Sequence, residues 1–166
     1  MKIRTMIQCA LLASLISICA WLAIPVGDIA VTLQTFGVFV ALFTLGGRYG
    51  TLTILLYLSL GAVGLPVFSG FQGGLGALLG VTGGYLWGFL LTGVVFLLLG
   101  DKAPLPAAFL GLAVCYFCGS AWIWHLYAKA DVIWILLKCV FPYVLPDLAK
   151  IFLACHISKR IKNALK

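Results

Sequence analysis

Apolar residues fill this chain in long blocks, and short groups of polar, glycine or proline residues separate the blocks. A helix that crosses the ~30 Å hydrocarbon core of a membrane needs ~20 predominantly apolar residues. The blocks therefore predict membrane helices over residues 6–24, 36–45, 51–62, 83–99, 105–127 and 146–156. The second and third are short for a full span. We therefore expect the loops beside them to dip into the membrane and to form a cavity open to the outer side.

Glycines concentrate in one uncharged stretch, GAVGLPVFSGFQGGLGALLGVTGGYLWGF, at residues 61–89, which holds ten of the chain's 19 glycines. At membrane depth, non-helical backbone is tolerated only where it is buried in protein or lines a cavity. Glycine permits the close approach and the positive φ angles that such a fold needs. We interpret the part between the third and fourth helices as an outer loop that forms or covers a binding cavity. The alternative is a flexible connection between two membrane helices.

Two outer segments do not fit the pattern of full spans. Residues 25–35 are predicted to form a loop that carries several polar side chains. Residues 129–143 contain an apolar run that is interrupted by Lys138 and is too short to span, which predicts an interfacial or re-entrant helix. Pro146 is then expected to begin the last helix, because the missing N–H of proline costs nothing in a first turn.

The composition supports a membrane protein of one domain. Of the 166 residues, 64% are hydrophobic and only 9% are charged, and the mean hydropathy is +1.19. A soluble domain of this length could not hide so much apolar surface. The predicted fold is an all-α integral membrane bundle of six transmembrane helices, with residues 1–166 forming a single membrane domain.

The charges predict the orientation of the bundle. Eleven Lys and Arg residues stand against four acidic residues, all of them Asp, and give a net charge of +7. Much of the excess lies at the two ends of the chain, and basic residues beside membrane helices face the cytoplasm. Both termini are therefore expected in the cytoplasm, as is Arg48 in a turn predicted at residues 46–50. The basic residues form no patch interleaved with aromatic residues, so nucleic-acid binding is not expected.

The cysteines and the N-terminus admit other interpretations, which we do not favour. Cys115 and Cys118 are spaced as in a zinc site, but they lie in an apolar helix without a second pair, and we expect no metal. The first apolar run follows two basic residues, as in a signal peptide, but it is long enough to span. We therefore keep it as the first helix.

Small residues recur at helical spacing in that first helix. Ala10 and Ser14 are four residues apart, as are Ala13 and Ser17. Such spacing lets another membrane helix approach closely. The partner helix could belong to another protein or to the same bundle, and the spacing alone does not distinguish the two.

An acid and a base stand three residues apart in the last helix, where Asp147 and Lys150 share one face. Ionisable groups within a span are costly and usually face a cavity or a partner. The pair could merely neutralise itself, or it could anchor a polar ligand, which we favour. The other acidic residues map to loops or interfaces: Asp28, Asp101 and Asp131.

The expected cavity has aromatic walls and few polar groups, which suits a small ligand with an apolar body, an N–H-rich head and one negative charge. The expected walls are Phe68, Phe71, Tyr85, Trp87, Trp134 and Tyr143, and the expected polar groups are Gln34, Thr35, Tyr85, Asp147 and Lys150.

Four groups of residues resemble those of the BioY family, the biotin-binding S components of energy-coupling factor (ECF) importers, and they occur in the same order. The groups are Thr32-Leu33-Gln34-Thr35-Phe36-Gly37, Gly64-Leu65-Pro66-Val67-Phe68, Thr82-Gly83-Gly84-Tyr85-Leu86 with Gly88-Phe89, and Asp147 with Lys150. One departure is Val81, where the family's loop usually has a proline.

The resemblance implies a six-helix S component in the cytoplasmic membrane of a bacterial-type cell, with biotin as substrate and no cofactor. A transmembrane T component and two ATPases would drive transport, and no nucleotide-binding motif stands in this chain. The implied ligand-binding residues are Gln34, Thr35, Phe71, Gly73, Gly74, Thr82, Tyr85, Trp87, Asp147 and Lys150. The implied residues of the T-component interface are Ala10, Ala13, Ser14, Ser17 and Arg48.

Three alternatives remain beside this interpretation. The first is an S component for another vitamin, such as riboflavin or thiamine. The second is an intramembrane enzyme, which the scattered acidic residues and two remote histidines disfavour. The third is a channel, which would need a polar pore lining. The resemblance also leaves open whether Lys150 meets the carboxylate of biotin or its urea oxygen.

Overall fold

The computed structural model describes residues 2–26, 29–127 and 131–164 and is mostly helical. Its elements follow one another as α1 (Ile3–Trp21), β1 (Ala23–Val26), β2 (Ile29–Thr32), α2 (Gln34–Ala62), the 3-10 turn η1 (Ser69–Phe71), α3 (Leu75–Leu79), α4 (Gly83–Leu99), α5 (Pro104–Leu126), α6 (Val132–Cys139) and α7 (Phe141–Ala164). Asp28 and Lys129, which the sequence places in outer segments, lie outside the described residues.

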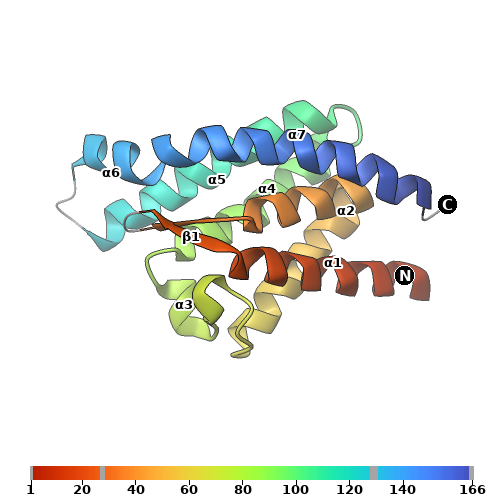
Figure 1. Ribbon diagram of the computed structural model, residues 1–166, viewed down its shortest axis with the longest axis horizontal. Helices are drawn as coiled ribbons and strands as arrows, with labels where there is room; N and C mark the ends of the chain where they lie inside the picture. The colour runs from red at the N-terminus through yellow and green to blue at the C-terminus, as the bar shows by residue number, and fades with distance from the viewer. Residues whose placement is uncertain (1, 27–28, 128–130, 165–166) are drawn as a thin grey trace.

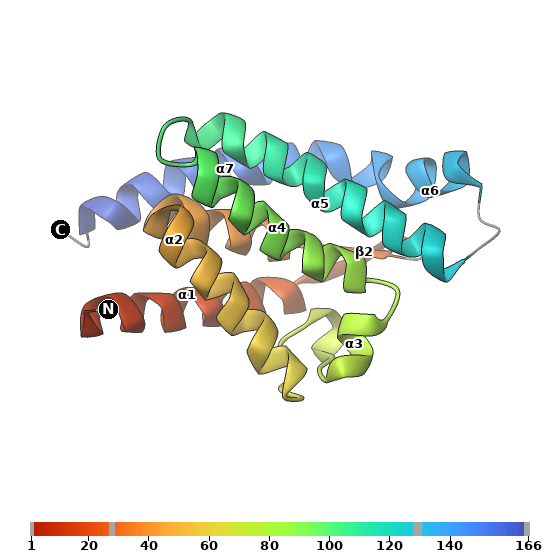
Figure 2. The ribbon, with the colours of Figure 1, turned by 180° about the vertical axis from the view of Figure 1, so that it is seen from behind.

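The helices form a bundle around α2, which packs against α1, α4 and α7, while α4 and α5 make the most extensive helix pair (Figure 1). The buried core is mainly apolar and includes Ile16, Phe39, Tyr57 and Ile151. Figure 2 shows the same bundle from behind, and in both views the start of α1 and the end of α7 lie at the same end. An even number of crossings would produce this arrangement.

The two short helices predicted at residues 36–45 and 51–62 are the two halves of α2, and they meet at a sharp break. Gly46 has φ 75° and ψ 178°, a backbone conformation that is strongly disfavoured for every residue except glycine. The predicted turn over residues 46–50 is therefore too wide, because helical geometry resumes at Gly47. That residue lies so close to α4 that an added Cβ would come within 2.5 Å of the Leu97 Cα atom.

Within the described residues, three helices are each long and apolar enough to cross a membrane: α1, α2 and α5. Helices α6 and α7 meet with a bend of 40° and together would make a fourth, and α4 is apolar but shorter. These features support a membrane protein, and the predicted number of six spans stays a prediction.

The last helix begins earlier than predicted, at Phe141 instead of Pro146, and continues to Ala164 instead of ending near residue 156. Pro142 occupies the first turn, where its missing N–H costs nothing, and Pro146 is accommodated within the helix. The short helix α6 lies in the segment for which an interfacial or re-entrant helix was predicted, and its place relative to the membrane stays a prediction. Asp131 caps α6, because its carboxylate accepts a hydrogen bond from the backbone N–H of Ile133 at 3.1 Å.

The segment predicted as a loop at residues 25–35 is mainly a hairpin. Strands β1 and β2 pair antiparallel, with Ala23 opposite Thr32 and Ile24 opposite Val31. Pairing of the two strands satisfies backbone N–H and C=O groups that would otherwise lack a hydrogen-bond partner. The end of β2 leads directly into α2 and brings Thr32 close to the core of the bundle.

The glycine-rich segment between α2 and α4, residues 63–82, is an irregular loop, as predicted, with η1 and α3 within it. Two indole N–H groups hold it by its backbone. Trp21 at the end of α1 donates to the Pro66 carbonyl at 2.8 Å, and Trp122 of α5 donates to the Gly80 carbonyl at 2.9 Å. The segment is therefore fixed to both neighbouring helices although most of its side chains are exposed.

The small residues of α1 fall on two different surfaces. Ala13 and Ser17 are buried inside the bundle, where they are 1% and 6% exposed, whereas Ala10 and Ser14 are exposed. The first pair therefore packs within this chain. Of the five residues predicted at the T-component interface, Ala10, Ser14 and Arg48 are exposed and available to a partner.

Candidate functional site

One cavity of about 90 Å³ lies where α2, α4, α5 and α7 converge beside the hairpin and the glycine-rich segment. Its lining combines aromatic rings with several polar groups and a single pair of opposite charges. The lining residues are Thr32, Gln34, Thr35, Phe68, Ser69, Gln72, Thr82, Tyr85, Leu86, Phe89, Tyr116, Cys139, Tyr143, Asp147 and Lys150.

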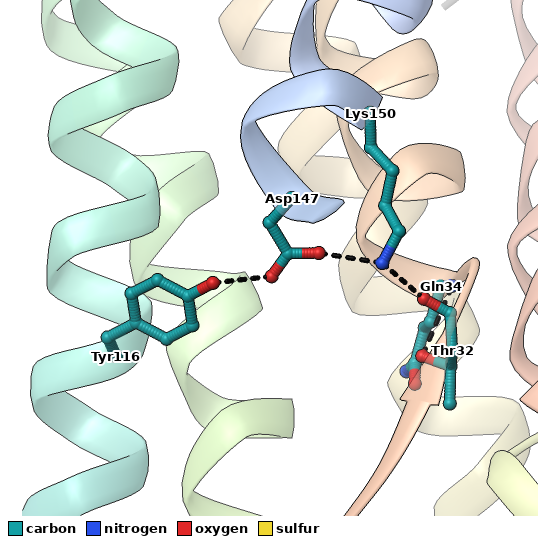
Figure 3. A network of polar contacts seen from close by, with 5 residues as sticks. All are labelled: Thr32, Gln34, Tyr116, Asp147 and Lys150. Carbon is teal, nitrogen blue, oxygen red and sulfur yellow. Dashed lines mark hydrogen bonds and ion pairs between the residues drawn. The ribbon is translucent and has the colours of Figure 1, made fainter. Parts of the chain in front are cut away.

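The charged wall of this cavity consists of Thr32, Tyr116, Asp147 and Lys150, which one line of short hydrogen bonds connects (Figure 3). Lys150 Nζ donates to Asp147 Oδ1 at 2.7 Å and to the Thr32 carbonyl oxygen at 2.7 Å. Tyr116 Oη donates to Asp147 Oδ2 at 2.7 Å. In Figure 3, Tyr116 and Thr32 lie on opposite sides of the ion pair, so three separate elements (β2, α5 and α7) hold it.

The ion pair is well shielded from solvent, with the side chains of Lys150 and Asp147 10% and 8% exposed. A buried pair recovers its desolvation cost only if further hydrogen bonds satisfy the remaining lone pairs and protons. Tyr116 and the Thr32 carbonyl supply two such bonds here. The pair is thus held in one geometry by groups that are not themselves charged.

Hydrogen-bonding capacity remains on both charged groups. A carboxylate offers about four acceptor positions, and an ammonium group has three donors. Asp147 uses one position on each oxygen within the chain, and Lys150 uses two of its three N–H groups. The wall can therefore accept hydrogen bonds from a ligand at Asp147 and donate one at Lys150 without breaking its own network.

The rest of the cavity is neutral. Tyr85 Oη donates its proton to the Cys139 carbonyl at 2.8 Å, so this hydroxyl offers a ligand only its lone pairs. The glycine-rich segment contributes Phe68 as an apolar surface and places Ser69, Gln72 and Thr82 at the lining. These three side chains have no hydrogen-bond partner in the part of the chain that the structure describes.

Six of the predicted ligand-binding residues line this cavity: Gln34, Thr35, Thr82, Tyr85, Asp147 and Lys150. The structure places four others outside it: Phe71, Gly73, Gly74 and Trp87. Phe71 stacks on Trp21, with ring centroids 5.1 Å apart, and is 64% exposed. Trp87 is 42% exposed, because it lies two residues beyond Tyr85 and therefore on another face of α4. Of the other expected walls, Phe68 and Tyr143 line the cavity and Trp134 does not.

Sequence reasoning missed two members of the charged wall. Tyr116 lies in the middle of an apolar helix, and nothing in its neighbourhood along the chain marks it. Thr32 was expected in an outer loop, and it acts through its backbone carbonyl, which no side-chain pattern can reveal. A buried Asp with a free carboxylate oxygen does, however, predict that a donor from another helix will meet it.

The sequence model of the BioY family matches residues 1–166 of this chain. The chain belongs to the BioY family. This finding confirms the resemblance drawn from the four groups of residues.

Individual BioY relatives match over nearly the whole chain. The chain is 39% identical over 165 residues to the biotin transporter BioY of Thermotoga maritima, covering 96% of each protein. It is 35% identical over 165 residues to the probable biotin transporter BioY of Pyrococcus horikoshii, covering 98% of this chain and 99% of the relative. Both relatives are named as transporters.

A solved structure shares the fold of this BioY chain. The crystal structure of the S-component for biotin from an ECF-type ABC transporter superposes with a TM-score of 0.87 at 26% sequence identity. The match covers 97% of this chain and 92% of the other. The overall fold of this chain is therefore similar to that of the biotin S-component of an ECF-type transporter.

Proposed function

We propose that this chain is the biotin-binding S component of an ECF-type importer. The observation that carries the proposal is the buried Asp147–Lys150 pair, held by Tyr116 and Thr32 at the wall of a mostly apolar cavity. Membership of a family whose named relatives are biotin transporters supports biotin as the ligand.

The chemistry of biotin matches the free capacity of this cavity. Its ureido ring carries two N–H donors, and the ionised carboxylate of Asp147 accepts such donors in strong charge-assisted bonds. Its sulfur ring is apolar and suits the surfaces of Phe68, Leu86 and Phe89. The valerate carboxylate needs donors, and the third N–H of Lys150 or the neutral groups of the glycine-rich segment supply them. Whichever of these groups binds the valerate carboxylate, Asp147 accepts hydrogen bonds from the ureido ring.

The arrangement of the helices supports an importer subunit in the cytoplasmic membrane. We propose six crossings, by α1, the two halves of α2, α4, α5 and α7, with both termini in the cytoplasm. The start of α1 and the end of α7 at one end of the bundle agree with this topology. A T component and two ATPase subunits would supply the energy, and the exposed Ala10, Ser14 and Arg48 are the proposed contacts with the T component.

Calorimetric titration of biotin into the detergent-purified protein tests the proposal. The variant is Asp147→Asn, which keeps the shape but removes the charge. The matched control is Asp101→Asn, the same change in the exposed turn between α4 and α5. We expect one-to-one binding that Asp147→Asn weakens by about 2–5 kcal/mol, the cost of removing one partner of a buried charged pair, and that the control leaves unchanged.

The other outcomes separate the parts of the proposal. Tight binding that Asp147→Asn does not weaken would keep biotin as the ligand and exclude Asp147 as its anchor. Absence of binding by the folded protein, with riboflavin or thiamine binding instead, would identify an S component for another vitamin. Turnover of a substrate or conduction of ions would contradict the proposed function altogether.

A further inference from the structure

A second polar network lies behind the cavity wall and connects α2 to the glycine-rich segment. Gln34, at the start of α2, lines the cavity and is 5% exposed. Its side-chain Nε2 lies 2.8 Å from the hydroxyl of Tyr57, in the second half of the same helix. The Tyr57 hydroxyl in turn lies 3.1 Å from the Val67 carbonyl oxygen. Tyr57 is completely buried and does not itself reach the cavity.

The single hydroxyl proton of Tyr57 fixes the direction of both bonds. The Val67 carbonyl can only accept, so Tyr57 must donate to it. The hydroxyl oxygen is then left to accept from Gln34, which requires the NH₂ side of the amide to face Tyr57. The opposite orientation of the amide would set its oxygen against a hydroxyl whose proton is already in use.

This orientation leaves the amide oxygen of Gln34 for the cavity. Among the described residues this oxygen has no hydrogen-bond partner. Two residues with acceptor oxygens on different elements therefore line the cavity, Asp147 on α7 and Gln34 on α2. Figure 3 shows Gln34 beside Thr32, on the far side of the Lys150 ammonium group from Asp147, so the two residues stand on different sides of this group.

We propose that Tyr57 is a positioning residue that holds Gln34 as a second acceptor, and that the site thereby selects ligands with two N–H donors rather than one. The inference rests on the proposed function, because the ureido group of biotin is the donor pair. Tyr57 acts only through Gln34. A merely structural Tyr57 would affect all ligands equally, whereas a positioning Tyr57 affects the discrimination between them.

The test uses biotin and its two mono-N-methyl ureido derivatives, each of which lacks one N–H. Binding of all three is measured for the wild-type protein, Tyr57→Phe, Gln34→Met and the double variant. Tyr57→Phe keeps the ring that contacts Phe68 edge-on at 5.4 Å between centroids and removes only the hydroxyl. Tyr127→Phe, the same change at the exposed end of α5, is the matched control.

We expect Tyr57→Phe to weaken biotin binding roughly three- to tenfold, the size of one hydrogen bond, and the control to leave it unchanged. In Tyr57→Phe we also expect one methyl derivative to bind with the same affinity as biotin. The other derivative should still bind more weakly than biotin. Gln34→Met should give the same selective pattern. Adding Tyr57→Phe to Gln34→Met should then have no further effect.

Several results would overturn the inference. If all three ligands weaken by the same factor, Tyr57 only supports the fold. If Tyr57→Phe still weakens binding in the Gln34→Met background, it acts through Val67 and the glycine-rich segment. If Tyr57→Phe does not fold, Gln34→Met decides alone, and an unchanged preference among the three ligands refutes the inference. A wild-type protein that binds no biotin refutes the proposed function itself, which is a distinguishable result.

Discussion

The charged wall and the glycine-rich segment, on two sides of the same cavity, are built in different ways. The charged wall is held by three hydrogen bonds of 2.7 Å between side chains and backbone of three elements, and its ion pair is at most 10% exposed. The glycine-rich segment is mostly exposed, carries no charge, and is attached to the bundle through its backbone carbonyls.

This difference separates a preorganised part of the site from an adaptable part. Groups that already hold their binding geometry spend little free energy on ordering when a ligand arrives. The charged wall is of this kind, because residues of the chain itself supply all three of its hydrogen bonds. Only Val67, Phe68 and Leu78 of the glycine-rich segment are buried, so we expect its remaining, more exposed residues to be the part of the cavity wall that moves when biotin enters or leaves.

The largest expected effect comes from breaking the charged wall. Lys150→Met removes the ammonium group and leaves the Asp147 carboxylate buried with Tyr116 as its remaining partner. Uncompensated burial of this kind costs about 3–5 kcal/mol. Lys102→Met, in the exposed turn between α4 and α5, should change stability by less than about 0.5 kcal/mol.

Thermal unfolding in detergent compares these two lysine variants. A melting temperature of Lys150→Met close to that of Lys102→Met would show that Asp147 tolerates burial without its lysine partner. The double variant Asp147→Asn with Lys150→Met should be more stable than Lys150→Met alone, since it leaves no unpaired charge.

A smaller effect is expected from filling space in the glycine-rich segment. An added Cβ at Gly73 would come within 2.2 Å of the Leu65 carbonyl oxygen, so Gly73→Ala forces a backbone shift and should cost about 1–3 kcal/mol. Gly76, in α3, has open space around its Cβ position, and Gly76→Ala should stabilise by about 0.4–1 kcal/mol. Equal melting temperatures for the two variants would mean that the segment has no fixed fold.

The smallest expected effect tests the boundary of the cavity. Phe71 stacks on Trp21 outside the lining, so Phe71→Ala should change biotin affinity by no more than about twofold. Phe68, which lines the cavity and is 3% exposed, should lose about tenfold in affinity on the same change. Titration of biotin into both variants measures these two affinities. A greater loss of affinity in Phe71→Ala than in Phe68→Ala would mean that the glycine-rich segment closes over the ligand with Phe71 facing the cavity.

The sequence by itself determined the membrane class, most helices and the acid–base pair of the site. Long apolar blocks leave few alternatives to membrane helices, and an ionisable pair within such a block stands out because burial of charge is costly. The glycine content between the third and fourth predicted helices likewise indicated irregular backbone beside a cavity. The four groups of residues that resemble those of BioY proteins, in the same order along the chain, were enough to identify the family.

Only the tertiary structure decided which residues face the cavity. Phe71 and Trp87 are aromatic, as are Phe68 and Tyr85, but only the second two line the cavity. Which way such a ring faces depends on contacts with distant residues, as the stacking of Phe71 on Trp21 shows. Tyr116 and the Thr32 carbonyl join Asp147 and Lys150 across long stretches of sequence. Hydrogen bonds of this kind are set by the packing of whole helices, so no local pattern can encode them, and the geometry of the site is a property of the assembled bundle.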